Sequence, residues 1–398
     1  MTQDTSILCA LFDAALKAAL PDGKFDGRLP PRPKGSTLVL GAGKASARMA
    51  AAFEEAWTRA GGACEGLVVT RYGHGAPTRH VEIVEASHPV PDEAGLKAAG
   101  RILALAREAG PDDLVVCLMS GGASALLSLP AEGLTLADKQ AVNRALLKSG
   151  APIGEMNLVR KSLSAIKGGR LAAAIGGAPL VTYLISDVPG DDPSSIGSGP
   201  TIPERVDPEV ALSILKRYDI DAPAHVAQAI RANAIEGPIA GGAVHMLATP
   251  KMALDAAAAK AREFGLNPLI LGDALEGEAR EVGHVMAGIA HSALLHGDPV
   301  RAPCVLLSGG ETTVTVRGQG RGGRNAEFLL ALVLALKGEP AISAIACDTD
   351  GIDGSESNAG AWFDGSLLEE ARQKGIDLAS CLAGNDAYTA FSRLDRLV

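Results

Sequence analysis

The amino-acid sequence predicts an α/β protein whose N-terminal domain is a doubly wound, three-layer structure built around a parallel sheet. Its 398 residues are 47% hydrophobic but only 3% aromatic, a composition typical of Val/Leu/Ile strands and Ala-rich helices. Strand-like runs alternate with helical stretches, as crossover connections between parallel strands require. Most of these runs end in glycine turns or acidic loops, and such sheets bind ligands at the carboxyl ends of their strands.

Five strand-like runs organise the first half of the chain. They occupy residues 36–41, 65–70, 81–86, 113–122 and 179–187. Ala/Leu-rich stretches such as 43–57 and 92–110 lie between most of these runs and predict the covering helices. The segment 1–23 has the pattern of an amphipathic helix that Asp4 or Thr5 caps.

A second α/β domain with a mixed sheet is predicted for the rest of the chain. A helical stretch at 204–236 leads into a Gly/Pro-marked segment, so we place the domains at 1–236 and 237–398. Further strand-like runs occupy residues 245–249, 267–273, 302–318 and 341–351. The alternating pattern of 305–320 predicts a hairpin, which would make this sheet mixed.

Bulk properties predict a cytoplasmic protein that acts on small molecules. The N-terminus lacks the basic start of a signal peptide, and no apolar run approaches the roughly 18 residues of a transmembrane helix. Six scattered cysteines without a C-x-x-C pair indicate free thiols. The net charge of −9 argues against nucleic acid as the main partner, whereas local lysines and arginines can still bind a small anion. Because α/β enzymes are often dimers, a homodimer is compatible with the sequence, which does not determine the oligomeric state.

The first glycine turn, residues 41–46, carries a lysine that neither standard phosphate motif explains. Gly41 and Gly43 flank the turn, and Lys44 begins the helix. A Walker A loop would need a glycine at 38 and a hydroxyl at 45, where Leu38 and Ala45 stand. A dinucleotide fingerprint would need glycine or alanine at 46, which is a serine. The segment therefore consists of a strand, a turn with two glycines and the start of a helix, to which a lysine cation is added.

Two further turns are suited to anions. Ser120, Gly121, Gly122 and Ser124 lie between a strand and a helix, where backbone N–H groups bind phosphate or carboxylate, although a tight structural turn fits equally well. The glycine-rich segment 317–328 holds three arginines, whose forked guanidinium groups match phosphate, or it is a disordered surface loop.

Three acids follow the strand that ends near residue 186. Asp187, Asp191 and Asp192 are placed to bind a hard cation such as Mg²⁺ or to act as a base, unless they only cap a turn. Lys167 stands in a run of basic residues at helical spacing, which can bind an anion or form a solvated face. His88 lies in a proline-stiffened loop, where a structural role is the simpler interpretation.

Lysines, arginines and glycine turns suit phosphate oxygens, and acids at a strand end suit the metal that bridges them. This combination indicates phosphoryl transfer, in which positioning and charge neutralisation dominate catalysis.

Eight segments of this chain, taken in order, resemble the two-domain glycerate 2-kinases, whose C-terminal half carries a MOFRL domain. They are GAGKAS, SHPVPDEAG, SGGASALL, NLVRKSLSAIKGGRLA, SDVPGDDPSSIGSGPT, SGGETTVTVRGQGRGGRNAEF, DTDGIDG and GNDAY. Each is weak alone, but eight in family order over nearly the whole chain are highly specific.

The resemblance implies ATP-dependent phosphorylation of D-glycerate to 2-phosphoglycerate with Mg²⁺. The site would lie in a cleft between a Rossmann-like glycerate kinase domain and a MOFRL-type domain. It further implies that Lys44 and Arg324 are the key catalytic cations. By placement we add Asp187 as a catalytic base or metal ligand and Asp191 as a metal ligand. The residues expected to bind substrate or phosphate are Gly41, Gly43, His88, Ser120, Gly121, Gly122, Ser124, Lys167, Gly309, Gly310, Glu311 and Asn325.

This sequence differs from the family's usual pattern at its C-terminal end. Family members usually continue past the position of Val398 with another strand segment, so the second domain is expected to lack its last segment.

Two alternative functions remain open. One is an NAD(P)H-dependent hydroxypyruvate reductase, because relatives carry that label. The other is a non-catalytic sensor of phosphorylated small acids, for which the acids after residue 186 would be superfluous.

Overall fold

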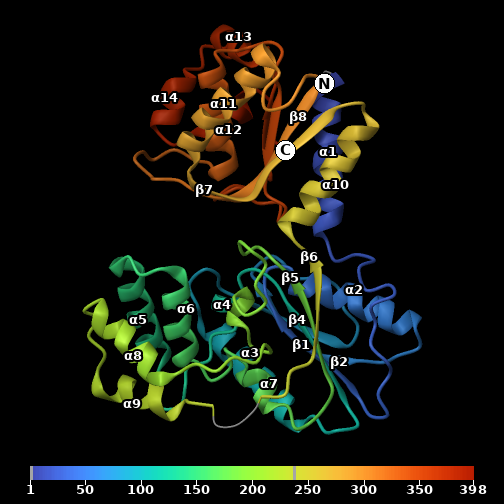
Figure 1. Ribbon diagram of the computed structural model, residues 1–398, viewed down its shortest axis with the longest axis vertical. Coiled ribbons are helices and arrows are strands. Elements are labelled where there is room, and N and C mark those ends of the chain that lie inside the picture. Colours follow the sequence, from blue (N-terminus) through green and yellow to red (C-terminus); the bar gives the residue numbers. More distant parts are fainter. Residues whose placement is uncertain (1–2, 236–238) are drawn as a thin grey trace. The chain divides into compact units, whose positions relative to one another are not determined.

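The computed structural model describes residues 3–235 and 239–398. These divide into two compact α/β units, each with its own hydrophobic core (Figure 1). The first unit is Pro21–Ala248, and the second is Thr249–Val398 together with the N-terminal segment up to Leu20.

A parallel six-stranded sheet forms the centre of the first unit, which confirms the predicted fold class. Its strands are β1 (Thr37–Ala42), β2 (Glu65–Arg71), β3 (Val81–Ala86), β4 (Leu114–Met119), β5 (Leu180–Ile185) and β6 (Ala243–Ala248). They lie in the order β3-β2-β1-β4-β5-β6, and all neighbours are parallel. The chain order reverses between β1 and β4, and ligands of such sheets bind at the carboxyl ends of the strands at this point.

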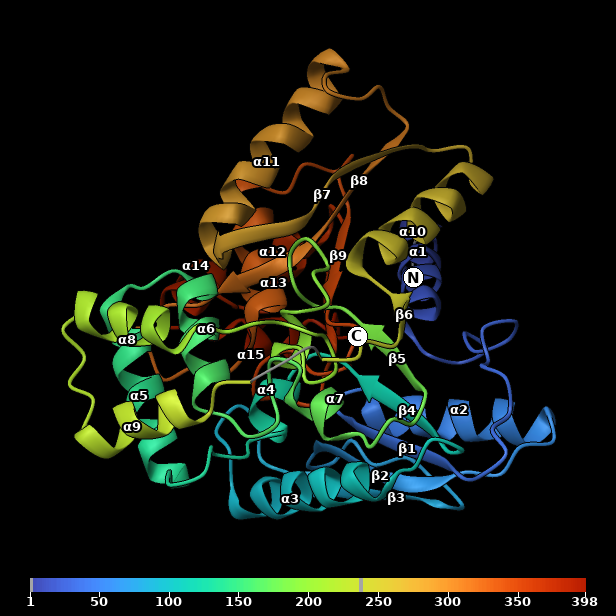
Figure 2. The ribbon, with the colours of Figure 1, turned by 60° about the horizontal axis from the view of Figure 1, so that its bottom comes forward.

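Helices cover both faces of this sheet, as a doubly wound fold requires. On one face α2 (Ser46–Arg59) packs Phe53 and Trp57 against the sheet, and on the other α3 (Glu93–Glu108) packs Ile102 (Figure 2). The smaller elements of the unit are α4 (Ala123–Leu126), α5 (Leu136–Ser149), α6 (Ile153–Ser162), α7 (Arg170–Ala174), the 3₁₀ turn η1 (Ile196–Ser198), α8 (Pro208–Arg217) and α9 (Ala224–Ala232). Helices α5, α6, α8 and α9 share a small core of their own, at the left of the first unit in Figure 1.

The second unit contains a parallel and an antiparallel strand pair covered by helices. Its elements are α1 (Gln3–Ala19), α10 (Pro250–Glu263), β7 (Asn267–Glu278), α11 (Ala279–His296), β8 (Cys304–Thr313), α12 (Arg324–Leu336), β9 (Ala344–Cys347), β10 (Gly360–Phe363), α13 (Leu367–Gln373), α14 (Leu378–Ala383) and α15 (Ala387–Arg393). β7 pairs with β8 in parallel, and β9 pairs with β10 in antiparallel orientation. This unit is therefore the second α/β domain expected, and its parallel and antiparallel pairs lie in two separate sheets where one mixed sheet was predicted.

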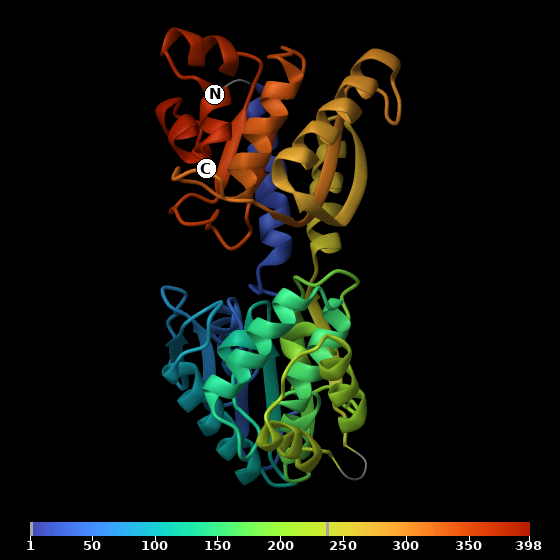
Figure 3. The ribbon, with the colours of Figure 1, turned by 90° about the vertical axis from the view of Figure 1, so that its left-hand side faces the viewer.

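Two segments belong to the other unit from the one expected. The N-terminal helix α1 packs in the second unit beside α10, as Figures 1 and 3 show in blue and yellow. It already includes Asp4 and Thr5, which therefore do not cap it. Conversely, β6 is an edge strand of the first sheet, where it pairs with β5. The expected boundary at residue 236 lies outside the described residues, and the units divide between Ala248 and Thr249.

The predicted hairpin at 305–320 is wrong, because β8 pairs with β7 and ends at Thr313. After Thr313, backbone N–H groups that would have paired within a hairpin donate instead to side chains of other segments. The N–H of Thr315 donates to Glu278 Oε1 (2.9 Å), and the N–H of Arg317 donates to Asn385 Oδ1 (2.7 Å). At the C-terminal end of the described chain, Leu397 forms an antiparallel bridge with Ala361 of β10. Among the described residues, no helix has the length and apolar character needed to cross a bilayer.

Candidate functional site

The turns that follow β1 and β4 are bound to each other at the switch point of the first sheet. Ala42 and Met119 are paired at the strand ends, so the two chains leave the sheet side by side. The N–H of Lys44 donates to the carbonyl of Gly121 (2.8 Å), and the N–H of Ala45 donates to Ser120 Oγ (3.0 Å). These bonds fix the backbone that carries Lys44.

Gly41 and Gly43 have packing roles in this arrangement. A Cβ on Gly41 would lie 2.2 Å from the carbonyl oxygen of Leu118, and a Cβ on Gly43 would lie 2.1 Å from Ser120 Oγ. Gly43 also has φ +137°, which side chains rarely adopt. Their predicted role in phosphate binding stays a prediction.

The β1 turn differs from a dinucleotide-binding turn in how its N–H groups are used. Each backbone N–H from 43 to 46 donates to an acceptor within the protein: Val69 O, Gly121 O, Ser120 Oγ and Gly43 O. The Ser46 hydroxyl also donates to Val69 O (2.7 Å), which explains a serine where a fingerprint needs glycine or alanine. A pyrophosphate bound in the usual way would have to compete with these bonds.

Four loops bring most of the predicted residues of the first unit together. A Cβ on Gly121 would lie 1.8 Å from Asp187 Oδ2, so the Asp187 carboxylate, after β5, lies against this glycine. A Cβ on Gly122 would lie 3.1 Å from His88 Nε2 and 3.2 Å from Lys44 Cγ. Gly122 has φ +79°. Lys44, His88 and Asp187 therefore surround the Ser-Gly-Gly turn at the carboxyl ends of β1, β3, β4 and β5, and we name these three side chains with Ser120–Gly122 the switch-point site.

Ser124 and Lys167 lie beside this site, in contact with each other. Ser124 Oγ is 2.6 Å from Ser198 Oγ, and Lys167 Nζ donates to the carbonyl of Ser124 (2.5 Å). Lys167 is only 2% exposed, so the alternative of a solvated basic face is wrong for this residue. Burial, followed by the nearby charges of Lys139, Arg160 and Lys161, lowers the pKa of Lys167 well below its usual range.

The acids after β5 have different environments. Asp192 caps its own turn, because its carboxylate accepts hydrogen bonds from Ser194 N (3.0 Å) and from the hydroxyls of Ser194 and Ser195. Asp191 has φ +54°, and its Oδ1 is buried without a hydrogen-bond partner in the part of the chain that the structure describes. A buried carboxylate oxygen without a donor is suited to a cation. The described residues include no cluster of three or more His, Cys, Asp or Glu side chains for a metal.

In the second unit, Arg324 begins α12 and is held by carboxylates. It forms ion pairs with Glu311 of β8 and, at 3.2 Å, with Asp348 Oδ2. Burial opposes its charge, but the hydrogen bond and charge of Glu311 and the charge of Asp348 outweigh burial and raise the pKa of Arg324. Asn325 lies next to it, and Asp353 caps the helix by accepting the N–H groups of Asn325 and Ala326 (both 2.9 Å).

Gly309 and Gly310 lie in β8, directly before Glu311, which pairs with Arg324. A Cβ on Gly310 would lie 2.0 Å from the carbonyl oxygen of Leu275, so this glycine lets β7 and β8 approach. A Cβ on Gly309 would meet nothing closer than 3.7 Å. Arg324, Glu311 and Asn325 are thus brought together in the second unit, whereas Lys44 and Arg324 lie in different units.

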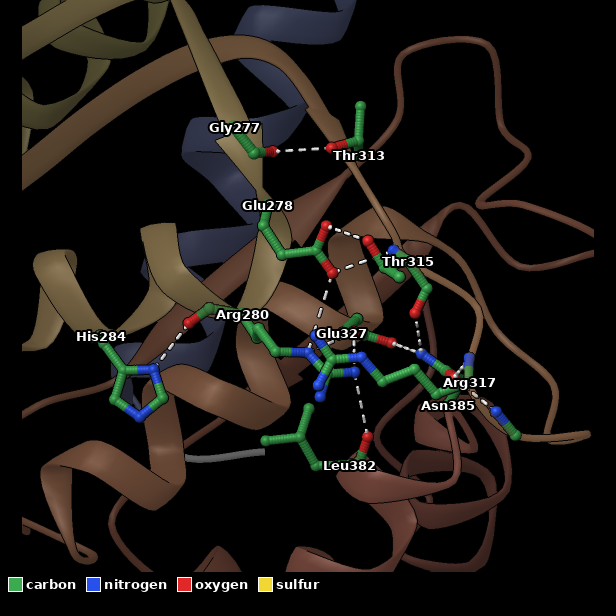
Figure 4. Close-up of polar contacts among 11 residues, drawn as sticks. Gly277, Glu278, Arg280, His284, Thr313, Thr315, Arg317, Glu327, Leu382 and Asn385 are labelled. Carbon is green, nitrogen blue, oxygen red and sulfur yellow. Dashed lines mark hydrogen bonds and ion pairs between the residues drawn. The ribbon is translucent and has the colours of Figure 1, made fainter.

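The network that orders the glycine–arginine loop before α12 was not predicted from the sequence. The side chain of Asn385 (φ +54°) accepts from the N–H groups of Arg317 and Gly318 and donates to Glu327 Oε2 (2.9 Å). Glu327 in turn pairs with Arg280 Nη2 (2.6 Å), as Figure 4 shows. The loop is therefore anchored, contrary to the disordered alternative. In the sequence, Asn385 and Glu327 of this network lie in two of the segments that carry the family resemblance, GNDAY and the segment that ends in RNAEF.

A surface cavity of about 680 Å³ lies elsewhere. It opens at the amino-terminal ends of β1 and β2, the opposite end of the sheet from the switch-point site, and is lined by residues including Arg32, Trp57 and His80. None of the predicted site residues lines it.

Comparisons with known proteins match both units. Residues 7–231 match the model of a domain of unknown function (DUF4147), and residues 304–398 match the MOFRL family. A protein of Agrobacterium vitis named as a hydroxypyruvate reductase is 55% identical over 98% of this chain and 90% of its own length. The D-glycerate 2-kinase of Thermotoga maritima is 37% identical over 96% of this chain and 92% of its own length. The crystal structure of a Thermotoga maritima glycerate kinase superimposes with a TM-score of 0.87, at 36% identity, over 99% of this chain and 94% of that one.

Proposed function

Because this chain belongs to the glycerate 2-kinase family, which joins a DUF4147 domain to a MOFRL domain, we propose that it transfers the γ-phosphoryl group of ATP to the 2-hydroxyl of D-glycerate. Glycerate kinase relatives and their fold support phosphorylation of glycerate by a kinase. The proposal also includes ATP as the phosphoryl donor and 2-phosphoglycerate as the product.

The observation that carries the proposal is the switch-point site itself. It combines a cation, an imidazole and a carboxylate around a glycine turn, at the edge of the sheet where α/β enzymes bind ligands. Phosphoryl transfer needs little covalent chemistry from the protein, so positioned charges account for most of the catalysis. Lys44 would neutralise charge on the transferring phosphoryl group or on the glycerate carboxylate.

Asp187 would act as the general base. The 2-hydroxyl oxygen of glycerate attacks the γ-phosphorus, its proton passes to the Asp187 carboxylate, and the bond from the γ-phosphorus to the bridging oxygen breaks to release ADP. Positioned proton transfer of this kind contributes about 10²–10⁴ in rate. Asp187 lies against Gly121, where any side chain would displace it.

The donor set after β5 fits a magnesium ion. Mg²⁺ in kinases is held by one or two carboxylates together with substrate phosphates, and Asp191 has a buried oxygen with no donor among the described residues. Asp191 would hold the ion, which when bound neutralises charge on the nucleotide phosphates, and the Asp187 carboxylate stays available to accept the substrate proton.

Arg324 would supply the second cation from the other unit. Its ion pairs with Glu311 and Asp348 orient a guanidinium group whose fork matches phosphate oxygens. We propose that Lys44 and Arg324 both neutralise charge in the same phosphoryl transfer.

A hydroxypyruvate reductase is the second candidate, since relatives more than half identical to this chain bear that name. The β1 turn argues against it, because its N–H groups are already used within the protein. In addition, β2 ends in Thr70 and Arg71, where an NAD enzyme needs an acid for the ribose.

Two assays on the purified full chain separate these functions. ³¹P NMR with ATP, Mg²⁺ and D-glycerate should give the signal of 2-phosphoglycerate and no 3-phosphoglycerate. NADH or NADPH with hydroxypyruvate should show no oxidation of the cofactor. Cofactor oxidation without a phosphorylated product would refute the kinase in favour of the reductase, and inactivity in both assays would favour a sensor.

A further inference from the structure

Five basic side chains lie close to one another around α5, α6 and the start of α7, beside the switch-point site. The charges of Lys139, Arg160 and Lys161 act on Lys167, Arg170 donates to the carbonyl of Lys167, and Lys167 contacts Ser124. We name these five side chains the cation cluster. Four of them are buried, with exposures of 3% for Lys139, 4% for Lys161, 2% for Lys167 and 8% for Arg170. So many buried cations are unusual, since lysine and arginine are almost never fully buried unless they are paired.

Carboxylates balance only part of this charge. Glu204 pairs with Lys161 and also acts on Arg170, and Asp192 lies near enough to Lys161 for the lysine charge to act on it. Within residues 3–235 and 239–398, no carboxylate forms an ion pair with Lys139, Arg160 or Lys167. With all five basic groups protonated, the cluster would therefore carry more positive charge than Glu204 and Asp192 balance.

The hydrogen bonds of the cluster leave donors unused. Lys167 donates to the Ser124 carbonyl, and Arg170 donates to the carbonyls of Lys167 (3.0 Å) and Asn233 (2.7 Å). In contrast, Lys139 Nζ is buried and has no hydrogen-bond partner among the described residues. A buried ammonium group without a partner is costly, and here a second buried lysine, Lys167, lies near enough for the charge of Lys139 to act on it.

Two physical consequences follow from this burial. Burial lowers the pKa of Lys139 to about 7, and burial together with the neighbouring charges lowers the pKa of Lys167 well below its usual range. An anion placed among these groups would reverse both effects, because an opposite charge favours the protonated lysine.

We propose that the cation cluster binds a small oxyanion, held by Lys139 and Lys167 with Arg160 beside them. The ligand would lie next to α4, because Lys167 contacts Ser124 and Ser124 contacts Ser198. Helix α4 begins directly after the Ser120–Gly122 turn, so the oxyanion group belongs to a molecule that reaches the switch-point site. The chemistry fits the carboxylate of the acid substrate or a phosphate group. Only the identity of this ligand rests on the proposed function.

The test is calorimetric binding to the full chain without catalysis, using D-glycerate in one titration and inorganic phosphate in the other. The variants are Lys139→Met, which keeps the length of the side chain, and Lys148→Met, which removes an exposed lysine from the same helix α5. Because Lys139→Met removes a charge-assisted hydrogen bond to the ligand, it should weaken binding by about tenfold or more, whereas Lys148→Met should leave binding unchanged.

A thermal unfolding series separates ligand binding from a purely structural role. If the role of Lys139 is to bind an anion, Lys139→Met should unfold at a higher temperature than the wild type when no ligand is present. When ligand is added, Lys139→Met should not show the rise in unfolding temperature that the wild type shows. Weakened D-glycerate binding identifies the carboxylate as the source, and weakened phosphate binding alone identifies a phosphate group. Unchanged binding of both ligands in Lys139→Met would overturn the inference. If the wild type shows no kinase activity but binds phosphate, and Lys139→Met loses this binding, the proposed function is refuted and the oxyanion site is supported.

Discussion

Replacing Lys139 by methionine should change how the stability of the first unit depends on pH. The unfolded chain holds the Lys139 proton up to its ordinary pKa of 10.5, whereas the folded protein releases it at about 7. Between these values the unfolded state binds more protons, so the free energy of unfolding of the wild type rises with pH. Below about pH 7 both states are protonated, and the folded protein bears the full cost of the buried charge.

The pKa values set the size of the effect. The difference between 10.5 and about 7 corresponds to up to about 5 kcal/mol. Lys139→Met has no ammonium group to bury, so it should be the more stable protein at about pH 6. Its advantage should shrink by up to this amount towards about pH 10.

Urea unfolding at several pH values measures this difference. The chain has two tryptophans, Trp57 in the first unit and Trp362 in the second, so a Trp362→Phe background lets Trp57 fluorescence report the unit that contains Lys139. Lys148→Met should show the pH dependence of the wild type. If the stability difference between Lys139→Met and wild type does not vary with pH, or if the variant is less stable at about pH 6, the reasoning is refuted.

Three further predictions concern the switch-point site and the glycine–arginine loop. Gly121→Ala should lower kcat/KM for D-glycerate by about 10²–10³, because the added Cβ would displace the Asp187 carboxylate. The control is Gly100→Ala, whose added Cβ would have no atom within 4 Å, and its steady-state kinetics should match those of the wild type. Asp191→Asn should raise the Mg²⁺ concentration needed for half-maximal activity by about tenfold, and an unchanged Mg²⁺ titration would contradict its role as a ligand. Asn385→Ala should speed hydrogen exchange at residues 317–323 and destabilise the second unit by about 1–3 kcal/mol, and exchange as slow as in the wild type would contradict the anchoring role of Asn385.

The strands and the Lys44 turn could be predicted because their signals are local. Apolar runs that end in a glycine turn or an acidic loop define β1, β4 and β5 without knowledge of their partners. The membership of α1 and β6 could not be predicted, since each packs with elements from a distant part of the chain.

The physical roles of individual residues were harder to predict than the elements. Gly43 needs to be a glycine because of Ser120, which is 77 positions further along the chain and is brought close only by the β1–β4 pairing. Likewise, the spacing of the basic residues near Lys167 is the same for a solvated helix face and for a buried cluster. Tertiary packing decides between them, and Lys139, which completes the cluster, lies on another helix.

We propose that Lys44 of the first unit and Arg324 of the second serve one phosphoryl transfer. The most direct test is a double-mutant cycle on the rate of 2-phosphoglycerate formation, measured by ³¹P NMR for the wild type, Lys44→Ala, Arg324→Ala and the double variant. Each single variant should lose about 10²-fold or more, and the double variant should lose much less than the product of the two losses, because both cations act on the same group. A wild-type rate in either single variant, or losses that simply multiply, would contradict a joint role of the two cations.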